Sequence, residues 1–200
     1  VIDINDDAGW RRFGGLCAGA DVLIENLAPD DALAPRLTAE VTARHPHLVH
    51  ATIADFGRSG PRSRWRLEPL PAFAASGALW ASGFPDRAPC WLPGYQAHDC
   101  AAIIAVAGVL AALLDRARSG RGQTVEVSVQ EAGLAALDPW AIVLADYARV
   151  YPALPSALPR DAEGPALVLP TADGHVRVLA VTPRQWRAFL ALLANREVSS

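Results

Sequence analysis

Residues 93–130, PGYQAHDCAAIIAVAGVLAALLDRARSGRGQTVEVSVQ, decide the fold of this chain. The apolar residues in the middle of this stretch predict a long helix that runs to about Arg118. Gly120 follows the last turn and suits a left-handed helix end, while the basic residues before it complement the helix dipole. The β-branched residues of 124–129 then predict a strand. The stretch therefore predicts a helix that leads directly into a strand.

The upstream sequence alternates in the same way between apolar runs and helical patterns. Strands are expected at 1–4, 21–25 and 48–53, and helices at 6–19, 34–44, 71–82 and 130–147. Strands separated by helices of this length predict βαβ units and a parallel sheet. We therefore expect an α/β fold with a Rossmann-like parallel sheet and flanking helices.

Proline and turn residues divide the chain into two parts. Residues 1–150 are expected to form part of a large domain, and the four prolines of 151–165 predict a linker. In residues 166–200 an alternating pattern on both sides of Ala172-Asp173-Gly174 predicts a β-hairpin, and a helical pattern follows it. This second part is expected to be the start of a smaller α+β domain.

Composition narrows the class of protein. The net charge is −3 and the basic residues do not cluster, so nucleic acid is not expected as a partner. The three cysteines, at positions 17, 90 and 100, are an odd number and contain no C-x-x-C pair. We therefore expect no disulfide framework and no zinc site, and this cysteine content fits a protein of the reducing cytoplasm. The apolar run 100–114 is shorter than the roughly 20 residues that span a bilayer, so it is expected to be a core helix without a membrane partner.

Asp99 is the residue with the clearest chemical potential. It lies about one turn from the positive end of the long helix, which favours its ionised form. An anion among alanine and isoleucine is costly unless it is solvated, paired or used, and such a carboxylate suits a nucleophile. The alternative is an Asp that only caps the helix or stabilises its first turn, because Asp favours this end of any helix.

The pattern resembles that of the family III CoA-transferases, the CaiB/BaiF family. In that family a catalytic Asp opens a helix of the type D-x-A-A-x-x-x-A-x-x-G-x-L-A-A-L-L, followed by R-x-R-T/S-G-R-G-Q and a V-x-V-S strand. The match from Asp99 to Gln123 needs no gap. Further blocks resemble the family at ADVLIENLAPDD (20–31), HLVHATIADFGRSGP (47–61) and LPTADGHVRVLAV (169–181).

The resemblance implies an enzyme that moves CoA from an acyl-CoA to a small carboxylic acid. Asp99 would be the nucleophile that forms an aspartyl intermediate. The residues that would border coenzyme A are Asn26, Leu27, Phe56, Gly57 and Gln96. For Asn26 the alternative is a turn-forming residue, and for Phe56 and Gly57 it is packing at a strand end. The family also implies an interlocked homodimer and no metal.

Several positions depart from the family pattern. Leu27 stands at the position of an aromatic residue, and Asp30 replaces the Gly of P-G. Leu67-Glu68-Pro69 replaces a G-Y-D or G-H-D block, whose His an α-methylacyl-CoA racemase uses, so that alternative is the weaker one. The loop 160–164 is charged where the family has a glycine-rich loop. The family's first βαβ unit and C-terminal portion are not found, so we expect a fragment, and an inactive truncated paralogue stays a third alternative.

Overall fold

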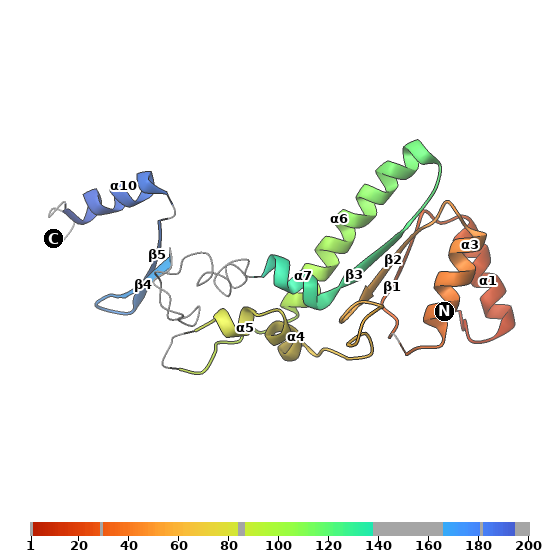
Figure 1. Ribbon diagram of the computed structural model, residues 1–200, viewed down its shortest axis with the longest axis horizontal. Coiled ribbons are helices and arrows are strands. Elements are labelled where there is room, and N and C mark those ends of the chain that lie inside the picture. The colour runs from red at the N-terminus through yellow and green to blue at the C-terminus, as the bar shows by residue number, and fades with distance from the viewer. Residues whose placement is uncertain (1, 29, 84–86, 138–165, 181, 195–200) are drawn as a thin grey trace.

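The structure is a computed structural model, and a parallel sheet forms its centre (Figure 1). The residues that it describes are 2–28, 30–83, 87–137, 166–180 and 182–194. The sheet contains β1 (Val22–Glu25), β2 (Val49–Ala54) and β3 (Thr124–Ser128), in that order. Both pairs of neighbours are parallel. The expected α/β fold and the strands at 21–25, 48–53 and 124–129 are thus confirmed to within one residue.

One face of the sheet is covered by the first helices. These are α1 (Asp7–Ala18) and a continuous helical run made of α2 (Leu33–Arg36), a π-helical turn η1 (Leu37–Val41) and α3 (Thr42–Arg44). Asp6 caps α1, because its carboxylate accepts a hydrogen bond from the nitrogen of Gly9. A cluster of large apolar side chains joins these helices to the sheet: Trp10, Cys17, Leu37, Val41 and Leu48.

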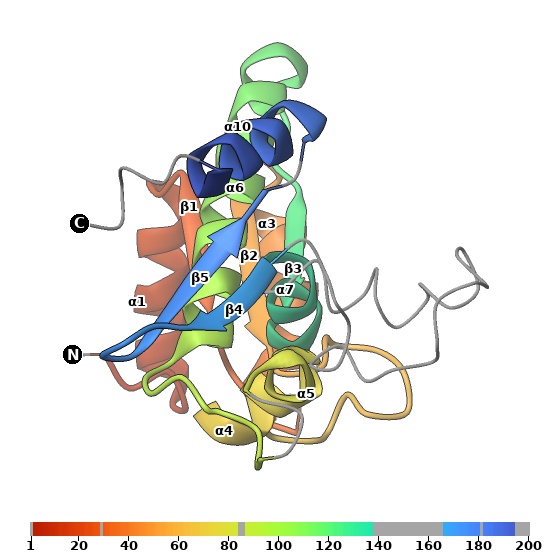
Figure 2. The ribbon, with the colours of Figure 1, turned by 90° about the vertical axis from the view of Figure 1, so that its left-hand side faces the viewer.

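The long helix α6 (Gln96–Ser119) packs against the opposite face (Figures 1 and 2). Val109 and Ala112 of this helix form a cluster with Val49 and Ala51 of β2. The helix ends at Gly120, whose φ of 70° is left-handed, as the sequence predicts. The chain then returns directly along β3, so α6 and β3 form the predicted helix-to-strand unit.

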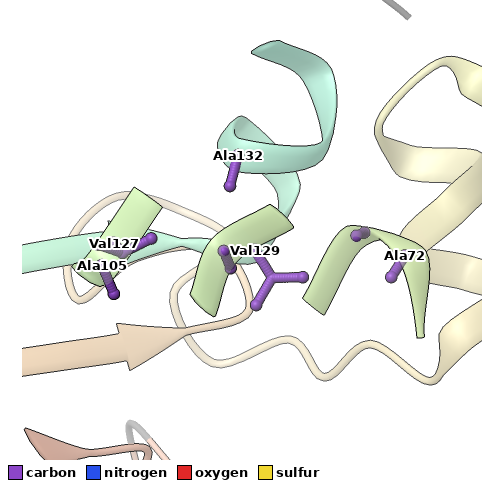
Figure 3. Packing of buried hydrophobic residues seen from close by; sticks show 7 residues of the cluster. Ala72, Ala105, Val127, Val129 and Ala132 are labelled. Carbon is purple, nitrogen blue, oxygen red and sulfur yellow. The ribbon is translucent and has the colours of Figure 1, made fainter. Parts of the chain in front are cut away.

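Short helices gather near the start of α6. They are α4 (Pro69–Ala75), α5 (Ala78–Ala81) and α7 (Val129–Ala136). Small side chains let these segments approach closely, and Figure 3 shows Ala72 of α4, Ala105 of α6 and Ala132 of α7 in one cluster. The single helix expected at 71–82 is wrong in one respect: Gly77, with a φ of 81°, breaks it into α4 and α5.

The C-terminal part forms a separate small motif. Strands β4 (Ala166–Pro170) and β5 (His175–Leu179) pair antiparallel, and α10 (Pro183–Ala194) follows. The predicted hairpin and helix are therefore confirmed. The expected linker at 151–165, the loop at 160–164 and the second half of the helix expected at 130–147 lie outside the described residues.

The strand expected at 1–4 is wrong. Residues 2–6 instead form a turn in which the carboxylate of Asp3 accepts hydrogen bonds from the backbone and side-chain nitrogens of Asn5, at 3.0 and 2.9 Å. Local hydrogen bonds of this kind compete with strand pairing. The apolar pattern of these few residues did not show this competition.

Helix α6 ends within one residue of the predicted end at about Arg118 and extends beyond the apolar run 100–114 on both sides. It has 24 residues and a mean hydropathy of 2.0 over an 18-residue window, so its length and composition alone would allow it to cross a membrane. Core helices of soluble proteins pass the same test. The alanine-rich side of α6 is buried against the sheet, but its outer side exposes large apolar residues: Ile103, Val106, Leu110 and Leu114. Only 28% of that window is buried, so the outer side of α6 is an exposed apolar face.

Candidate functional site

The predicted site residues gather at one edge of the sheet. Because all three strands are parallel, their carboxyl ends meet at this edge, which is where open α/β sheets usually bind ligands. Asn26 and Leu27 follow β1, and Phe56 and Gly57 follow β2. The sheet therefore brings the two upstream blocks of the family pattern to a common edge, although they are about 30 positions apart in the chain.

The first turn of α6 lies at the same edge. Ala97, in this turn, belongs to one buried cluster with Val129, which directly follows β3, and with Ala72 of α4. Figure 3 shows Val129 and Ala72 of this cluster. This packing fixes the start of α6 beside the carboxyl end of β3. Asp99 is two residues further along, so the site is built on a helix and on strand ends that share a core.

Asp99 is exposed, and no hydrogen bond or ion pair reaches its carboxylate from the described residues. It does not cap the helix: the N-cap position is Tyr95, and the backbone nitrogen of Asp99 donates a 2.8 Å hydrogen bond to the Tyr95 carbonyl oxygen. Capping is thus not supported, whereas an Asp that stabilises the first turn of the helix still fits, because Asp99 lies in that turn. The carboxylate is exposed to solvent and lies in the first turn of a 24-residue helix, near the positive end of the helix dipole.

The neighbouring thiol is not a competing nucleophile. Burial, and to a lesser extent the negative charge of Asp99, raise the pKa of the half-buried Cys100 thiol. A thiol with a raised pKa is protonated at neutral pH and reacts slowly. In this turn the carboxylate of Asp99 is thus exposed, whereas the thiol of Cys100 is half-buried and protonated.

Gln96 stabilises the loop that leads into α6. Its side-chain nitrogen donates a 3.2 Å hydrogen bond to the carbonyl oxygen of Pro93. Gly94 between them has a φ of 96°, which only glycine adopts readily. Gln96 therefore lies three residues before Asp99, as predicted, but in this structure its amide closes a turn.

The two predicted residues of the loop after β1 differ in exposure. The side chain of Asn26 is exposed and available to a ligand. Leu27 is half-buried and packs against the cluster around Trp10 and Leu37. Its side chain anchors the loop, so the backbone of Leu27 is the part of this residue that remains near the sheet edge.

The loop after β2 is held in shape by several contacts. Phe56 is half-buried and meets the ring of Trp65 edge-on, with centroids 5.8 Å apart. Gly57 is buried and has a φ of 78°. Asp55 accepts a hydrogen bond from the nitrogen of Leu67 at 2.9 Å, and its carbonyl oxygen accepts one from the nitrogen of Gln130 at 3.0 Å. These bonds fasten the loop at both ends.

Sequence reasoning missed a row of charged residues across the sheet. Glu25, Thr52 and Glu126 are register partners on neighbouring strands, so their side chains share one face. Both carboxylates bind Arg58: Glu25 pairs with its guanidinium, and Glu126 accepts a 2.6 Å hydrogen bond from its backbone nitrogen. The only signal for such a row in the sequence is an acidic residue inside an otherwise apolar strand. This signal can be interpreted only when the pairing register of the three strands is known.

An open cavity of about 390 Å³ lies on this polar face, between the sheet and the helical run α2–η1. Thr52, Thr124, Glu126 and Arg58 line the side formed by the sheet and the loop after β2. The cavity lies on the face of the sheet opposite to α6, the helix that carries Asp99. Among the described residues, no group of three or more His, Cys, Asp or Glu side chains is placed to hold a metal ion.

Comparison with known proteins gives a consistent result. The sequence model of "CoA-transferase family III" matches residues 1–200, the whole chain. A probable CoA-transferase of Mycobacterium tuberculosis is 34% identical over 98% of this chain and 25% of its own length. The succinyl-CoA:(R)-benzylsuccinate CoA-transferase subunit BbsE of Thauera aromatica is 32% identical over 95% of this chain and 46% of its own length.

A crystal structure of a CaiB/BaiF family protein from Brucella suis has a similar fold. The TM-score is 0.68 at 22% identity, over 96% of this chain and 51% of that chain. At this identity the likeness concerns the fold alone. The chain thus spans between a quarter and about half of the length of these three proteins.

Proposed function

The chain belongs to CoA-transferase family III, and we propose that the full-length protein moves CoA from an acyl-CoA thioester to a carboxylic acid. One structural observation supports this most directly: the carboxylate of Asp99 is exposed and unpaired in the first turn of α6, at the ligand-binding edge of the sheet. Transfer between two acids of similar energy needs a group that holds the acyl group and then CoA, and a carboxylate does both.

The proposed reaction uses Asp99 twice. Its carboxylate oxygen attacks the thioester carbonyl, the C–S bond breaks, and a mixed anhydride and CoA thiolate form. The thiolate then attacks the Asp99 carbonyl carbon, which releases the donor acid as a carboxylate and leaves an aspartyl-CoA thioester. The acceptor carboxylate reverses these steps, forms its own CoA thioester and restores Asp99. No external oxidant, reductant or metal is needed for this balance.

The sheet edge supplies the proposed contacts with coenzyme A. The exposed amide of Asn26 is a suitable hydrogen-bonding group, and Phe56 offers a half-buried ring at the end of β2. Gly57 is buried and would contribute indirectly, because its missing side chain lets the loop that carries Phe56 pack against Glu126. Leu27 contributes through its backbone and Gln96 through the turn before Asp99. This arrangement places a CoA-binding surface on two loops and the reactive group on a helix.

The donor and acceptor are proposed from the relatives. The Thauera aromatica protein is named for succinyl-CoA and (R)-benzylsuccinate, which is a dicarboxylate. We therefore propose succinyl-CoA as the first donor to test and a dicarboxylate as acceptor. The cytoplasm, where acyl-CoA is made and used, is the proposed location. An interlocked homodimer is the proposed assembly, and either it or the remaining part of the full-length chain would cover the outer side of α6.

A transfer assay tests the proposed activity. The full-length protein is incubated with succinyl-CoA and a dicarboxylate, and the new CoA thioester is detected by mass spectrometry. We expect product with the wild type and with Asp115→Ala, a matched change on the exposed surface of the same helix, and none with Asp99→Ala. Exchange of the α-proton of a 2-methylacyl-CoA without transfer would instead identify a racemase. Absence of both activities in a folded protein would favour the inactive paralogue.

A further inference from the structure

We propose that Glu25 is a positioning residue: its buried carboxylate locks the loops 26–28 and 55–58 into one arrangement, and this arrangement sets the affinity for the CoA thioester. The inference rests on the proposed function, because it concerns the same two loops. Glu25 itself does not touch the substrate in this proposal. It acts through Leu27 and Arg58.

The first half of this lock is local. Oε2 of Glu25 accepts a 2.6 Å hydrogen bond from the backbone nitrogen of Leu27. The exposed Asn26 lies between the two bonded residues, so the bond fixes the direction in which its side chain leaves the sheet. Without this acceptor the turn after β1 would keep only the packing of the Leu27 side chain.

The second half reaches a loop that is 33 positions away. Oε1 of Glu25 accepts a hydrogen bond from Nη2 of Arg58, which follows Phe56 and Gly57. Glu126 lies on β3, on the other side of β2, and its Oε1 accepts a 2.6 Å hydrogen bond from the backbone nitrogen of Arg58. Gly57 fits closely against the same carboxylate, because a Cβ at this position would lie 3.2 Å from Oε1 of Glu126. Arg58 is therefore held by its side chain and its backbone at once.

Burial makes the Glu25–Arg58 pair necessary. The side chain of Glu25 is only 7% exposed, and a buried carboxylate is costly without a counter-charge. His50 lies behind it, with Nε2 3.8 Å from Oε1, but this ring is fully buried, which favours its neutral form. Among the described residues Arg58 is thus the permanent cation that pairs with Glu25. Removing either partner is expected to release both loops.

The decisive variant is Glu25→Gln in the full-length protein, with Glu131→Gln as the matched control on an exposed surface of α7. We expect Glu25→Gln to raise the KM for the CoA thioester about tenfold, because the loss of one coupled interaction changes an affinity by about this factor. The kcat should stay within about twofold of the wild-type value. Glu131→Gln should leave both unchanged. A merely structural role would lower the amount of folded enzyme and hence kcat, and would not change KM.

A double-mutant cycle tests the coupling itself. Arg58→Gln alone should raise KM by a similar factor, and adding Glu25→Gln should raise it little further, since one pair is being broken. Amide hydrogen exchange gives a readout without substrate: Glu25→Gln should speed exchange at Leu27 and also at Arg58, although the acceptor of the Arg58 amide is Glu126. If Glu25→Gln does not fold, the KM of Arg58→Gln for the CoA thioester tests the inference instead: a raised KM supports it and an unchanged KM contradicts it.

Unchanged KM in either folded single variant, or independent effects that multiply in the double variant, would overturn the inference. These results are distinguishable from failure of the proposed function. If the wild type itself does not bind a CoA thioester, the function is wrong. If the wild type binds it and Glu25→Gln binds it equally well, the function stands and the positioning role does not.

Discussion

The Oδ2 atom of Asp55 accepts a 2.9 Å hydrogen bond from the backbone nitrogen of Leu67, twelve residues further along the chain. This bond closes the loop that carries Phe56 and Gly57, and the edge-on contact of Phe56 with Trp65 lies inside the closed loop. The loop is thus a defined structure, although its sequence is rich in Gly, Pro, Ser and Arg and predicts only irregular backbone.

Asp55→Ala is expected to open this loop. The loop contains four arginines, at 58, 62, 64 and 66, so trypsin reports its opening directly. We expect cleavage there to become about tenfold faster, because a hydrogen bond to a charged acceptor contributes roughly 1.5 kcal/mol. Asp55→Asn keeps an acceptor oxygen and should be cut more slowly than Asp55→Ala. Equal cleavage of the wild type and Asp55→Ala would show that the bond does not hold the loop.

Gly122 is required by close packing between the turn after α6 and the start of β2. Its nitrogen donates a 2.8 Å hydrogen bond to the carbonyl oxygen of Pro46, and a Cβ at this position would overlap the carbonyl group of Leu48. Gly122→Ala is therefore expected to lower the free energy of unfolding by about 1–3 kcal/mol, measured by urea denaturation.

A matched glycine lies in open space. A Cβ on Gly14, inside α1, would meet no atom within 4 Å, so Gly14→Ala should raise the free energy of unfolding by about 0.5–1 kcal/mol through helix propensity alone. We therefore predict that the free energy of unfolding falls in Gly122→Ala and rises in Gly14→Ala. A Gly122→Ala variant as stable as the wild type would contradict the described packing.

Histidine 50 is expected to make stability depend on pH. Burial lowers its pKa below the ordinary value of 6.5; the charge of Glu25 opposes this shift, and the smaller effect of Arg58 adds to it. As the pH falls below 6.5, the unfolded chain binds a proton that the native state excludes, so stability decreases by up to about 1.4 kcal/mol per pH unit; above 6.5 this contribution is constant.

His50→Gln removes this titration. Chemical denaturation between pH 7 and pH 5 should therefore show a shallower loss of stability in His50→Gln than in the wild type. Parallel pH profiles of the two proteins would mean that His50 accepts its proton in the folded state and is not held neutral.

The outer side of α6 predicts how the 200-residue chain behaves by itself. Ile103 and Leu114 are 70% and 72% exposed, and Val106 and Leu110 lie between them at helical spacing. This apolar stripe should cause concentration-dependent association in analytical ultracentrifugation. Ile103→Gln combined with Leu110→Gln should reduce it, whereas Asp115→Gln, exposed on α6 but outside this stripe, should not. A monomer at all concentrations would contradict the expectation.

The strands and the long helix could be predicted because their causes are local. Apolar runs bounded by turn residues place β1, β2 and β3, and Gly120 marks the end of α6. The break at Gly77 could not be predicted in the same way, because a glycine inside an apolar pattern also fits a continuous helix. At 2–6 a side-chain hydrogen bond decided the structure, and an apolar pattern does not show such a bond.

The site was predictable only as a set of segments. The match to the family pattern selected Asp99 and the two upstream loops, but it could not show that the Asp99 carboxylate is exposed and unpaired. The row of Glu25, Thr52 and Glu126 depends on the register of three strands, and the sequence does not give that register. For the same reason the pairing of Arg58 with Glu25, 33 positions apart, appears only in the fold.

Covalent trapping on Asp99 tests the central claim most directly. The full-length protein is incubated with succinyl-CoA, treated with hydroxylamine, digested and analysed by mass spectrometry. The account predicts a hydroxamate on the peptide that contains Asp99 in the wild type and in Asp115→Ala, and no such label, together with no transfer, in Asp99→Ala. A label on another residue, or transfer that survives in Asp99→Ala, would contradict the nucleophilic role of Asp99 and leave only the fold and the family in place.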